Sequence, residues 1–139
     1  MSTLQIRSFT DEDRAGVVAL WSLVFPDDPP WNEPAAMIQR KLTVQPELLL
    51  VACKEDQLVG AVMGGFDGVR GWIHHLAVHP RYRRQGVARA LMQAAELGLE
   101  KLGCPKVNLQ VRATNASVIA FYQSVGYLLE ERVSLGKRI

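Results

Sequence analysis

The chain combines short stretches in which apolar and polar residues alternate with longer ones in which apolar residues recur at helical spacing. Residues 4–9, LQIRSF, alternate and predict a first strand, and Thr10 with Asp13 three positions later resembles a helix-capping pair. The helix that follows has one apolar face, formed by Val17, Leu20, Trp21 and Val24. The prolines of PDDPP, residues 26–30, must end this helix, because proline has no amide donor.

The middle of the chain predicts a second, shorter helix and three strands. Asn32 is a candidate N-cap for that helix, which would carry Pro34 in its first turn. Residues 47–66 contain two apolar stretches separated by a polar turn at residues 55–57, and this pattern predicts an antiparallel hairpin. GWIHHLAV, residues 71–78, predicts a further strand.

The last part of the chain predicts two helices and two strands. Apolar residues recur at helical spacing from Gly86 to about Leu102, and KVNLQV, residues 106–111, predicts a strand. Residues 115–126 predict a helix, and YLLEERVSL, residues 127–135, predicts a last strand. This order of elements favours an α/β fold with a mixed sheet. No linker or repeat interrupts the pattern, so residues 1–139 are expected to form a single domain.

Composition narrows the classes of function. Hydrophobic residues make up 48% of the 139 positions and charged residues 22%, which is ordinary for a globular domain. The net charge of +2 does not indicate a nucleic-acid partner. No stretch approaches the about 18 consecutive apolar residues of a membrane span, and residues 1–9 lack the layout of a signal peptide. We therefore expect no membrane partner and a cytoplasmic location. Cys53 and Cys104 have neither metal-ligand nor disulfide spacing, so we expect no metal site.

A segment rich in arginine, residues 79–85, connects the predicted strand at 71–78 to the helix that begins at Gly86. The start of a helix offers unpaired amides and a positive dipole, and it becomes an anion site when no bulky side chain obstructs it. Gly86 and Ala88 keep the approach clear, and charge is supplied by Arg81, Arg83, Arg84 and Arg89. The segment has the sequence of neither a P-loop nor a G-x-G-x-x-G loop. It suits a pyrophosphate, and a solvated basic turn is the alternative.

Three blocks of the sequence resemble the GNAT superfamily of N-acetyltransferases. The family signature Q/R-x-x-G-x-G/A stands here as residues 83–88, RRQGVA, and residues 76–80 and 115–127 resemble the other two family blocks. The resemblance covers about residues 46–135 and implies a GNAT-type α/β fold. That fold has a mixed, mostly antiparallel sheet of about six to seven strands, about four helices, and a cofactor cleft between the fourth and fifth strands. PPWNEP, MGGFDGVRG, GCPKV and SLGKR further resemble the small bacterial YpeA-type members.

The resemblance implies acetyl-coenzyme A as co-substrate. The backbone amides that would bind its pyrophosphate are those of Arg83, Arg84, Gln85, Gly86, Val87, Ala88 and Arg89. Its pantetheine arm would pair like an added strand with Leu76, Ala77 and Val78, and the Leu76 amide would polarise the thioester carbonyl. Asn115 matches a family asparagine that touches the cofactor arm, and Tyr122 matches the tyrosine that protonates the leaving sulfur.

Alternatives stay open for these two residues and for the general base. Tyr122 could be a half-buried helix aromatic, and Asn115 resembles a helix N-cap. Trp72 and Gln110 occupy the positions at which other family members carry a glutamate that acts as base. Neither carboxylate is present, so the resemblance does not assign the base through them.

His74 is the candidate base, since it matches histidines on the fourth strand of amine-acetylating members. A histidine titrates near about 6.5 and can accept a proton at neutral pH. Strand alternation places Trp72, His74 and Leu76 on one face and His75 on the other, so only His74 should face the cleft. The alternative is a structural histidine, with water carrying the proton.

These observations favour an acyltransferase that moves the acetyl group of acetyl-coenzyme A to a primary amine by direct attack. The acceptor would be a small-molecule amine, a peptide N-terminus or a lysine. In the loop at residues 26–32, Asp27 and Asp28 could attract a cationic amine and Trp31 could cover it, or the loop could simply be solvated. A coenzyme-A-binding regulatory module without catalysis is the alternative function. The pattern leaves the acceptor, the acyl-chain tolerance and the choice between monomer and homodimer open.

Overall fold

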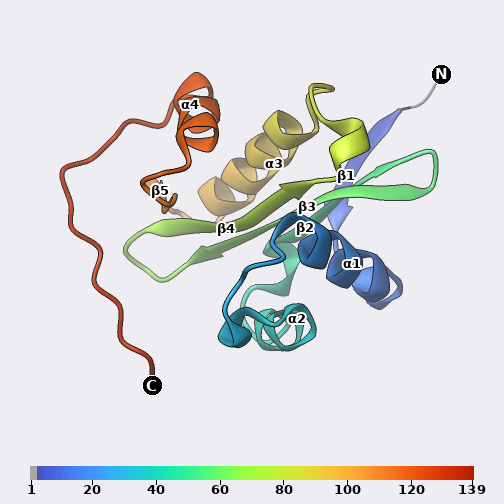
Figure 1. Cartoon of the computed structure of the whole chain (residues 1–139), viewed down its shortest axis with the longest axis horizontal. Coiled ribbons are helices and arrows are strands. Elements are labelled where there is room, and N and C mark those ends of the chain that lie inside the picture. The colour runs from blue at the N-terminus through green and yellow to red at the C-terminus, as the bar shows by residue number, and fades with distance from the viewer. Residues whose placement is uncertain (1–2) are drawn as a thin grey trace.

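Five strands form one mixed sheet in the computed structural model, which describes residues 3–139. In spatial order, which is also chain order, they are β1 (Leu4–Ser8), β2 (Leu49–Lys54), β3 (Gln57–Phe66), β4 (Gly71–Val78) and β5 (Val107–Leu109) (Figure 1). Neighbouring strands from β1 to β4 pair antiparallel, and β4 pairs parallel with β5. The prediction of a mixed, mostly antiparallel sheet is confirmed.

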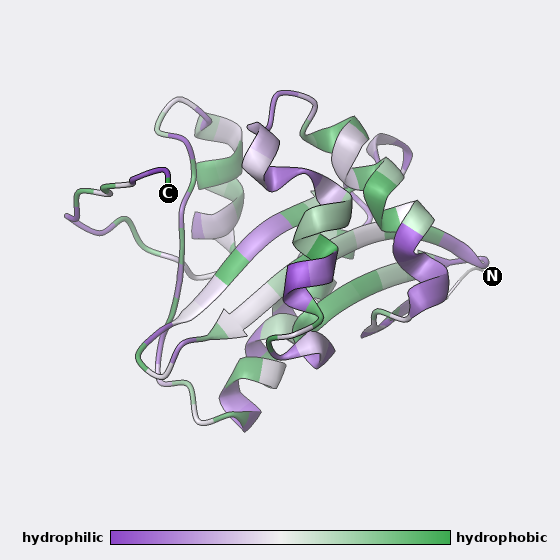
Figure 2. Ribbon diagram, turned by 90° about the horizontal axis from the view of Figure 1, so that it is seen from below, coloured by the Kyte–Doolittle hydropathy of each residue, from purple (hydrophilic) through white to green (hydrophobic). Residues whose placement is uncertain are grey.

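The described residues contain four α-helices, as predicted: α1 (Arg14–Val24), α2 (Pro34–Lys41), α3 (Val87–Lys101) and α4 (Ala116–Ser124). Leu49 and Val51 of β2 pack with α1 and α2, whereas Leu50 and Ala52 pack with α3. Because successive strand residues point to opposite faces, α1 and α2 cover one face of the sheet and α3 covers the other. Figure 2 shows the helices on both sides of the strands, each carrying hydrophobic and hydrophilic residues.

The predicted N-terminal cap is present before α1, but α2 is capped by a different residue from the one predicted. The Thr10 amide donates to Asp13 Oδ2 over 2.8 Å, which confirms the predicted pair before α1. Asn32, predicted to cap α2, lies instead in a short 3-10 turn. Glu33 is the N-cap, and its carboxylate accepts two first-turn amide hydrogen bonds. The longer side chain reaches those amides from one residue further along the chain.

The pairing between β3 and β4 is irregular at one point, where β4 has one more residue than β3 between two consecutive paired positions. Ala61 pairs with Ala77 and Met63 pairs with His74, so two residues of β4 lie opposite a single residue of β3. The first of the two, His75, has a φ of 53°, in the left-handed region that few side chains adopt. This arrangement is a β-bulge, which bends the strand and redirects its side chains.

The bulge overturns the predicted placement of side chains on β4. Ile73 and Leu76 both pack in the cluster around α3, so Leu76 does not share the face of His74. His75, predicted to oppose His74, packs its ring edge-on against Trp21 of α1. The predicted alternation is wrong beyond His74, because an inserted residue shifts the period of two.

The predicted strand at residues 127–135 is not formed, and β5 is shorter than the predicted 106–111. The expectation of six to seven strands is therefore wrong. Figure 1 shows the chain running from α4 to the C-terminus without regular structure. The large apolar side chains that stay exposed along this segment are Leu128, Leu129, Val133, Leu135 and Ile139.

Side-chain contacts, and not a backbone ladder, connect the C-terminal segment to β5. Glu130 forms an ion pair with Lys106 and accepts a 2.7 Å hydrogen bond from Asn108. The Ser134 hydroxyl accepts a 2.7 Å hydrogen bond from the side-chain Nε2 of Gln110. The sequence predicts a strand here, but among the described residues the segment has no neighbouring strand to pair with, and a strand requires one.

Candidate active site

The ladder between β4 and β5 stops halfway along β4. Its last pair joins Ile73 to Leu109, so among the described residues no strand accompanies the far half of β4 on that side. This open half contains Leu76, Ala77 and Val78, the residues that the sequence predicts for a pantetheine arm. An edge of free strand backbone is a template for pairing with an extended, amide-containing partner.

The open half of β4 leads directly into the loop before α3. In this loop Arg84 has a φ of 62° and Gly86 a φ of 82°. A Cβ at Gly86 would meet no atom within 4 Å, so this position favours glycine for its backbone angle and not for lack of space. Left-handed residues are a feature of the backbone nests that bind anions in other proteins.

The first turn of α3 is open to a ligand. Gly86 is its N-cap and provides no side chain to cap the helix. The first intrahelical hydrogen bond runs from the Ala90 amide to the Gly86 carbonyl over 3.0 Å, so the amides of residues 87–89 precede it. Arg83, Arg84 and Arg89 are exposed around this turn. A first turn with free amides and exposed arginines beside it has the character of an anion site.

Packing beneath the loop fixes the position of this first turn. Val87 is buried beside Gly60 of β3, where an added Cβ would come within 2.9 Å of Leu91 and 3.0 Å of Val87. Glycine at position 60 therefore permits the close approach of α3 to the sheet. Lys54 also donates a 2.7 Å hydrogen bond to Gln85, which ties the loop to the end of β2.

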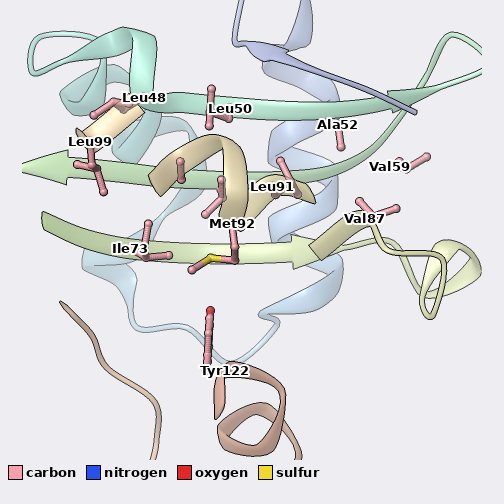
Figure 3. Packing of buried hydrophobic residues seen from close by; sticks show 12 residues of the cluster. Leu48, Leu50, Ala52, Val59, Ile73, Val87, Leu91, Met92, Leu99 and Tyr122 are labelled. Carbon is pink, nitrogen blue, oxygen red and sulfur yellow. The ribbon is translucent and has the colours of Figure 1, made fainter. Parts of the chain in front are cut away.

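Tyr122 of α4 belongs to the core cluster around α3. Its side chain is almost fully buried, and Figure 3 shows its hydroxyl directed toward Met92 and the strand that carries Ile73. Burial raises the pKa of Tyr122 to about 12. The hydroxyl therefore keeps its proton at neutral pH, which suits a proton donor.

Asn115 occupies the N-cap position of α4, but its side chain makes no capping hydrogen bond to the helix. The residue is exposed, and its carboxamide oxygen accepts a long 3.4 Å hydrogen bond from Ser117. Asn115 therefore stands at the N-cap position without acting as a cap, and its side chain is accessible to a ligand.

His74 is open to solvent on one side and is surrounded by protein on the other. Burial lowers its pKa, and electrostatic interactions with His75 and Lys41 lower it further. A histidine with a lowered pKa is neutral at pH 7 and can accept a proton.

Lys41 is a site feature that the sequence analysis missed. It is buried at the end of α2, where Nζ donates a 2.5 Å hydrogen bond to the Gly64 carbonyl, and burial lowers its pKa. The signal was available, because Lys41 follows Met37 by four positions and Ile38 by three, and both of those side chains face inward.

A cavity of about 220 Å³ lies beside the loop between α1 and α2. Its lining includes Trp21, Phe25, Asp28 and Glu33, but neither Asp27 nor Trp31, which are both exposed. Both carboxylates of this wall already have partners, because Glu33 caps α2 and Asp28 Oδ2 lies 2.7 Å from His75 Nε2. Of the loop residues considered from the sequence, only Asp28 is placed to contact a molecule in this cavity.

Two possible features are absent from the part of the chain that the structure describes. No group of three or more His, Cys, Asp or Glu side chains is arranged to hold a metal ion there. Within the same residues 3–139, no helix has the length and apolar character needed to span a bilayer.

Comparison with known proteins identifies the family. Residues 14–127 match the model of the acetyltransferase (GNAT) family. An acetyltransferase of Yersinia pestis is 43% identical over 139 residues, covering 98% of this chain and 96% of its own, and an acetyltransferase of Pectobacterium atrosepticum is 42% identical with the same coverage.

Solved structures agree in fold. The aminoglycoside N-acetyltransferase AAC(6')-Iy in complex with CoA superposes with a TM-score of 0.84 at 19% identity, covering 99% of this chain and 96% of that one. Ard1 from Thermoplasma volcanium gives a TM-score of 0.81 at 26% identity, covering 91% and 84%. The match to the family model and the close bacterial relatives together show that this chain is an acetyltransferase of the GNAT family.

Proposed function

We propose that this acetyltransferase moves the acetyl group of acetyl-coenzyme A to a primary amine by direct attack of the amine nitrogen. The observation that carries the proposal is the continuity between the open half of β4 and the uncapped first turn of α3. One path thus offers a strand edge for an amide-bearing arm and an anion site for a pyrophosphate. A structural neighbour, AAC(6')-Iy, was solved with CoA, which supports the same cofactor here.

The residues along this path fit such a ligand. Amides of residues 83–89 would hold the pyrophosphate, and the exposed arginines Arg83, Arg84 and Arg89 would add charge. The backbone of Leu76, Ala77 and Val78 would pair with the pantetheine arm, beyond the point where β5 ends. The Asn115 side chain, which is free of a capping bond, would contact the arm from α4.

Leu76 and Tyr122 would have separate roles at the thioester, the first at the carbonyl oxygen and the second at the sulfur. When bound, acetyl-coenzyme A supplies an acetyl carbon whose bond to sulfur breaks as its bond to nitrogen forms. The Leu76 amide would donate to the carbonyl oxygen as negative charge develops there. Tyr122 would give its proton to the departing sulfur, a role that its raised pKa of about 12 supports because the hydroxyl stays protonated.

The proton released by the attacking nitrogen needs an acceptor. His74 would take it, directly or through water, and its lowered pKa keeps the imidazole neutral and ready at pH 7. Lys41, whose charge contributes to the lowered pKa, would also disfavour a lasting positive charge on His74. The proton must therefore pass on to solvent, to which His74 is exposed.

The cavity beside the loop between α1 and α2 would hold the acceptor. Its aromatic and proline-rich lining, which includes the carboxylates of Asp28 and Glu33, favours a small cationic amine. Neighbours named as aminoglycoside N-acetyltransferases act on amines of that kind. A peptide N-terminus or lysine is the other acceptor class.

A coenzyme-A-binding regulatory module is the second candidate function. It is favoured by the lack of a carboxylate at Trp72 and Gln110, the latter of which is engaged with Ser134. Free-thiol release from acetyl-coenzyme A, screened against polyamines, aminoglycosides, amino acids and peptide N-termini, separates the two. Amine-dependent release supports the transferase, and tight binding of coenzyme A without release from any acceptor supports the module.

A further inference from the structure

We propose that Asp28 and His75 form a positioning pair that clamps the bulge of β4 to the loop before α2. The pair would hold the Leu76 amide and the acceptor cavity in one fixed geometry. This inference rests on the proposed function, because it gives the clamp a purpose in the transfer reaction. Neither residue is proposed to contact the reacting atoms through this role.

His75 is held by contacts from three residues. Its Nε2 lies 2.7 Å from Asp28 Oδ2, and because a carboxylate only accepts, the imidazole nitrogen donates. Its ring meets the rings of Trp21 and Phe25 edge-on, with centroids 5.6 Å and 4.9 Å away. The His75 side chain is 15% exposed and that of Asp28 is 24% exposed, so solvent screens this contact less than a surface ion pair.

The contact from α1 also sets the direction of the Leu76 amide. The His75 carbonyl accepts a 3.0 Å hydrogen bond from the Trp21 indole nitrogen. That carbonyl and the Leu76 N–H belong to one planar peptide, and in a trans peptide they point in opposite directions. Because Trp21 fixes the carbonyl toward α1, the Leu76 N–H must point away from α1.

The backbone of His75 would not hold this geometry unaided. A φ of 53° is unfavourable for histidine, and such conformations persist where the surroundings determine them. Asp28 supplies the hydrogen bond to the His75 side chain, and it comes from the loop between α1 and α2. Asp28 also lines the cavity of about 220 Å³ proposed for the acceptor. A single contact therefore joins the wall of that cavity to the strand that carries the Leu76 amide.

The first test needs no catalysis. In Asp28→Ala, the clamp is opened, and the indole proton of buried Trp21 should exchange with solvent at least about tenfold faster, as followed by NMR. Asp27→Ala removes an exposed carboxylate from the same loop, and its exchange rate should stay within about twofold of the wild type. Equal exchange rates in the two variants would overturn the clamp.

The second test asks whether the clamp serves the reaction. Asp28→Ala should lower kcat about tenfold, because a misplaced donor stabilises the developing oxyanion less well, while the calorimetric Kd for acetyl-coenzyme A stays within about twofold. A rise in KM for the amine at unchanged kcat would overturn the proposal, since Asp28 would then only bind the acceptor.

A double-mutant cycle completes the design. His75→Asn removes the ring but keeps a residue type that tolerates a positive φ. If the two residues act as a pair, Asp28→Ala should lower kcat no further in the His75→Asn background, and additive losses would contradict the pairing. Absence of transfer in the wild-type protein with every amine would count against the proposed function instead, so the two failures are distinguishable.

Discussion

The ring of Tyr127 meets the ring of Tyr122 edge-on, with centroids 5.8 Å apart, and the Tyr127 hydroxyl donates a 2.6 Å hydrogen bond to Glu96 of α3. Burial and the Glu96 carboxylate together raise the pKa of Tyr127, so this hydroxyl keeps its proton at neutral pH and can donate it in the hydrogen bond. Tyr127 thus anchors the end of α4 to α3. The anchor holds Tyr122 in the position from which it would donate its proton.

Tyr122→Phe should lower kcat by about 10² to 10⁴, the usual contribution of a general acid. The affinity for acetyl-coenzyme A should change little, because the hydroxyl acts chiefly as the thiolate departs. Steady-state kinetics with a calorimetric Kd measure both quantities. A decrease smaller than about threefold, with chemistry shown to limit the rate, would leave Tyr122 as a packing residue.

Ala88→Glu should abolish binding of coenzyme A without unfolding the protein. The new side chain would bring bulk and negative charge to the first turn of α3, where the pyrophosphate amides are proposed to lie. Loss of two charge-assisted hydrogen bonds would cost about 3 to 6 kcal/mol, or more than about a hundredfold in affinity. Gln93→Glu adds the same charge at an exposed position of α3 and serves as the control. Equal calorimetric affinities in the two variants would remove the anion site from residues 83–89.

The pH dependence of kcat/KM tests His74. A base must be neutral to act, so the rate should fall as pH drops through its pKa, and the lowered pKa of His74 places this acidic limb below about 6.5. His74→Ala should remove the limb. Lys41→Met removes a cation that lowers this pKa and should move the limb to higher pH.

The exposed lysine Lys101 provides the control for that series, since Lys101→Met should leave the limb in place. A limb that is unchanged in His74→Ala would belong to the ionisation of the acceptor amine. Water would then carry the proton away, and His74 would have no role as a base.

Arg7 and Asp13 provide a test of stability. Arg7 donates hydrogen bonds of 2.7 Å and 2.9 Å to the Asp13 carboxylate, and these hydrogen bonds lower the pKa of Asp13. A lowered folded-state pKa contributes stability above the unfolded value of about 3.9, and this contribution is lost as pH falls through the folded pKa.

Asp13→Asn should therefore lower the free energy of unfolding by about 1 to 2 kcal/mol at pH 7, a modest value because Arg7 is partly exposed. The difference from the wild type should shrink below about pH 3.9. Denaturant unfolding at several pH values measures it. Asp11→Asn, at an exposed carboxylate of the same turn, is the control, and an equal loss in both variants would contradict the assignment.

Local patterns predicted most of the fold, because α1 and α3 each bury one regular face and the β2–β3 hairpin is a continuous apolar pair of strands buried on both faces. The bulge at His75 could not be predicted, since an inserted residue is defined by its partner strand and leaves no local signature. The segment at 127–135 shows the same limit, because a strand needs a paired neighbour as well as residues that favour strands. Of the proposed site residues, those of the β4 edge and the α3 turn lie on one path as the sequence indicated, whereas the clamp of His75 by Asp28 and Trp21 arises only from tertiary contacts.

The central claim is that the open half of β4 and the first turn of α3 bind acetyl-coenzyme A for transfer to an amine. The most direct measurement is the yield of acetylated amine, by mass spectrometry, for each free thiol released in the wild type and in Ala88→Glu. The account predicts one acetylated amine per thiol in the wild type, no release without amine, and no product from Ala88→Glu. Equal yields from the two proteins, or thiol release that does not depend on the amine, would contradict it.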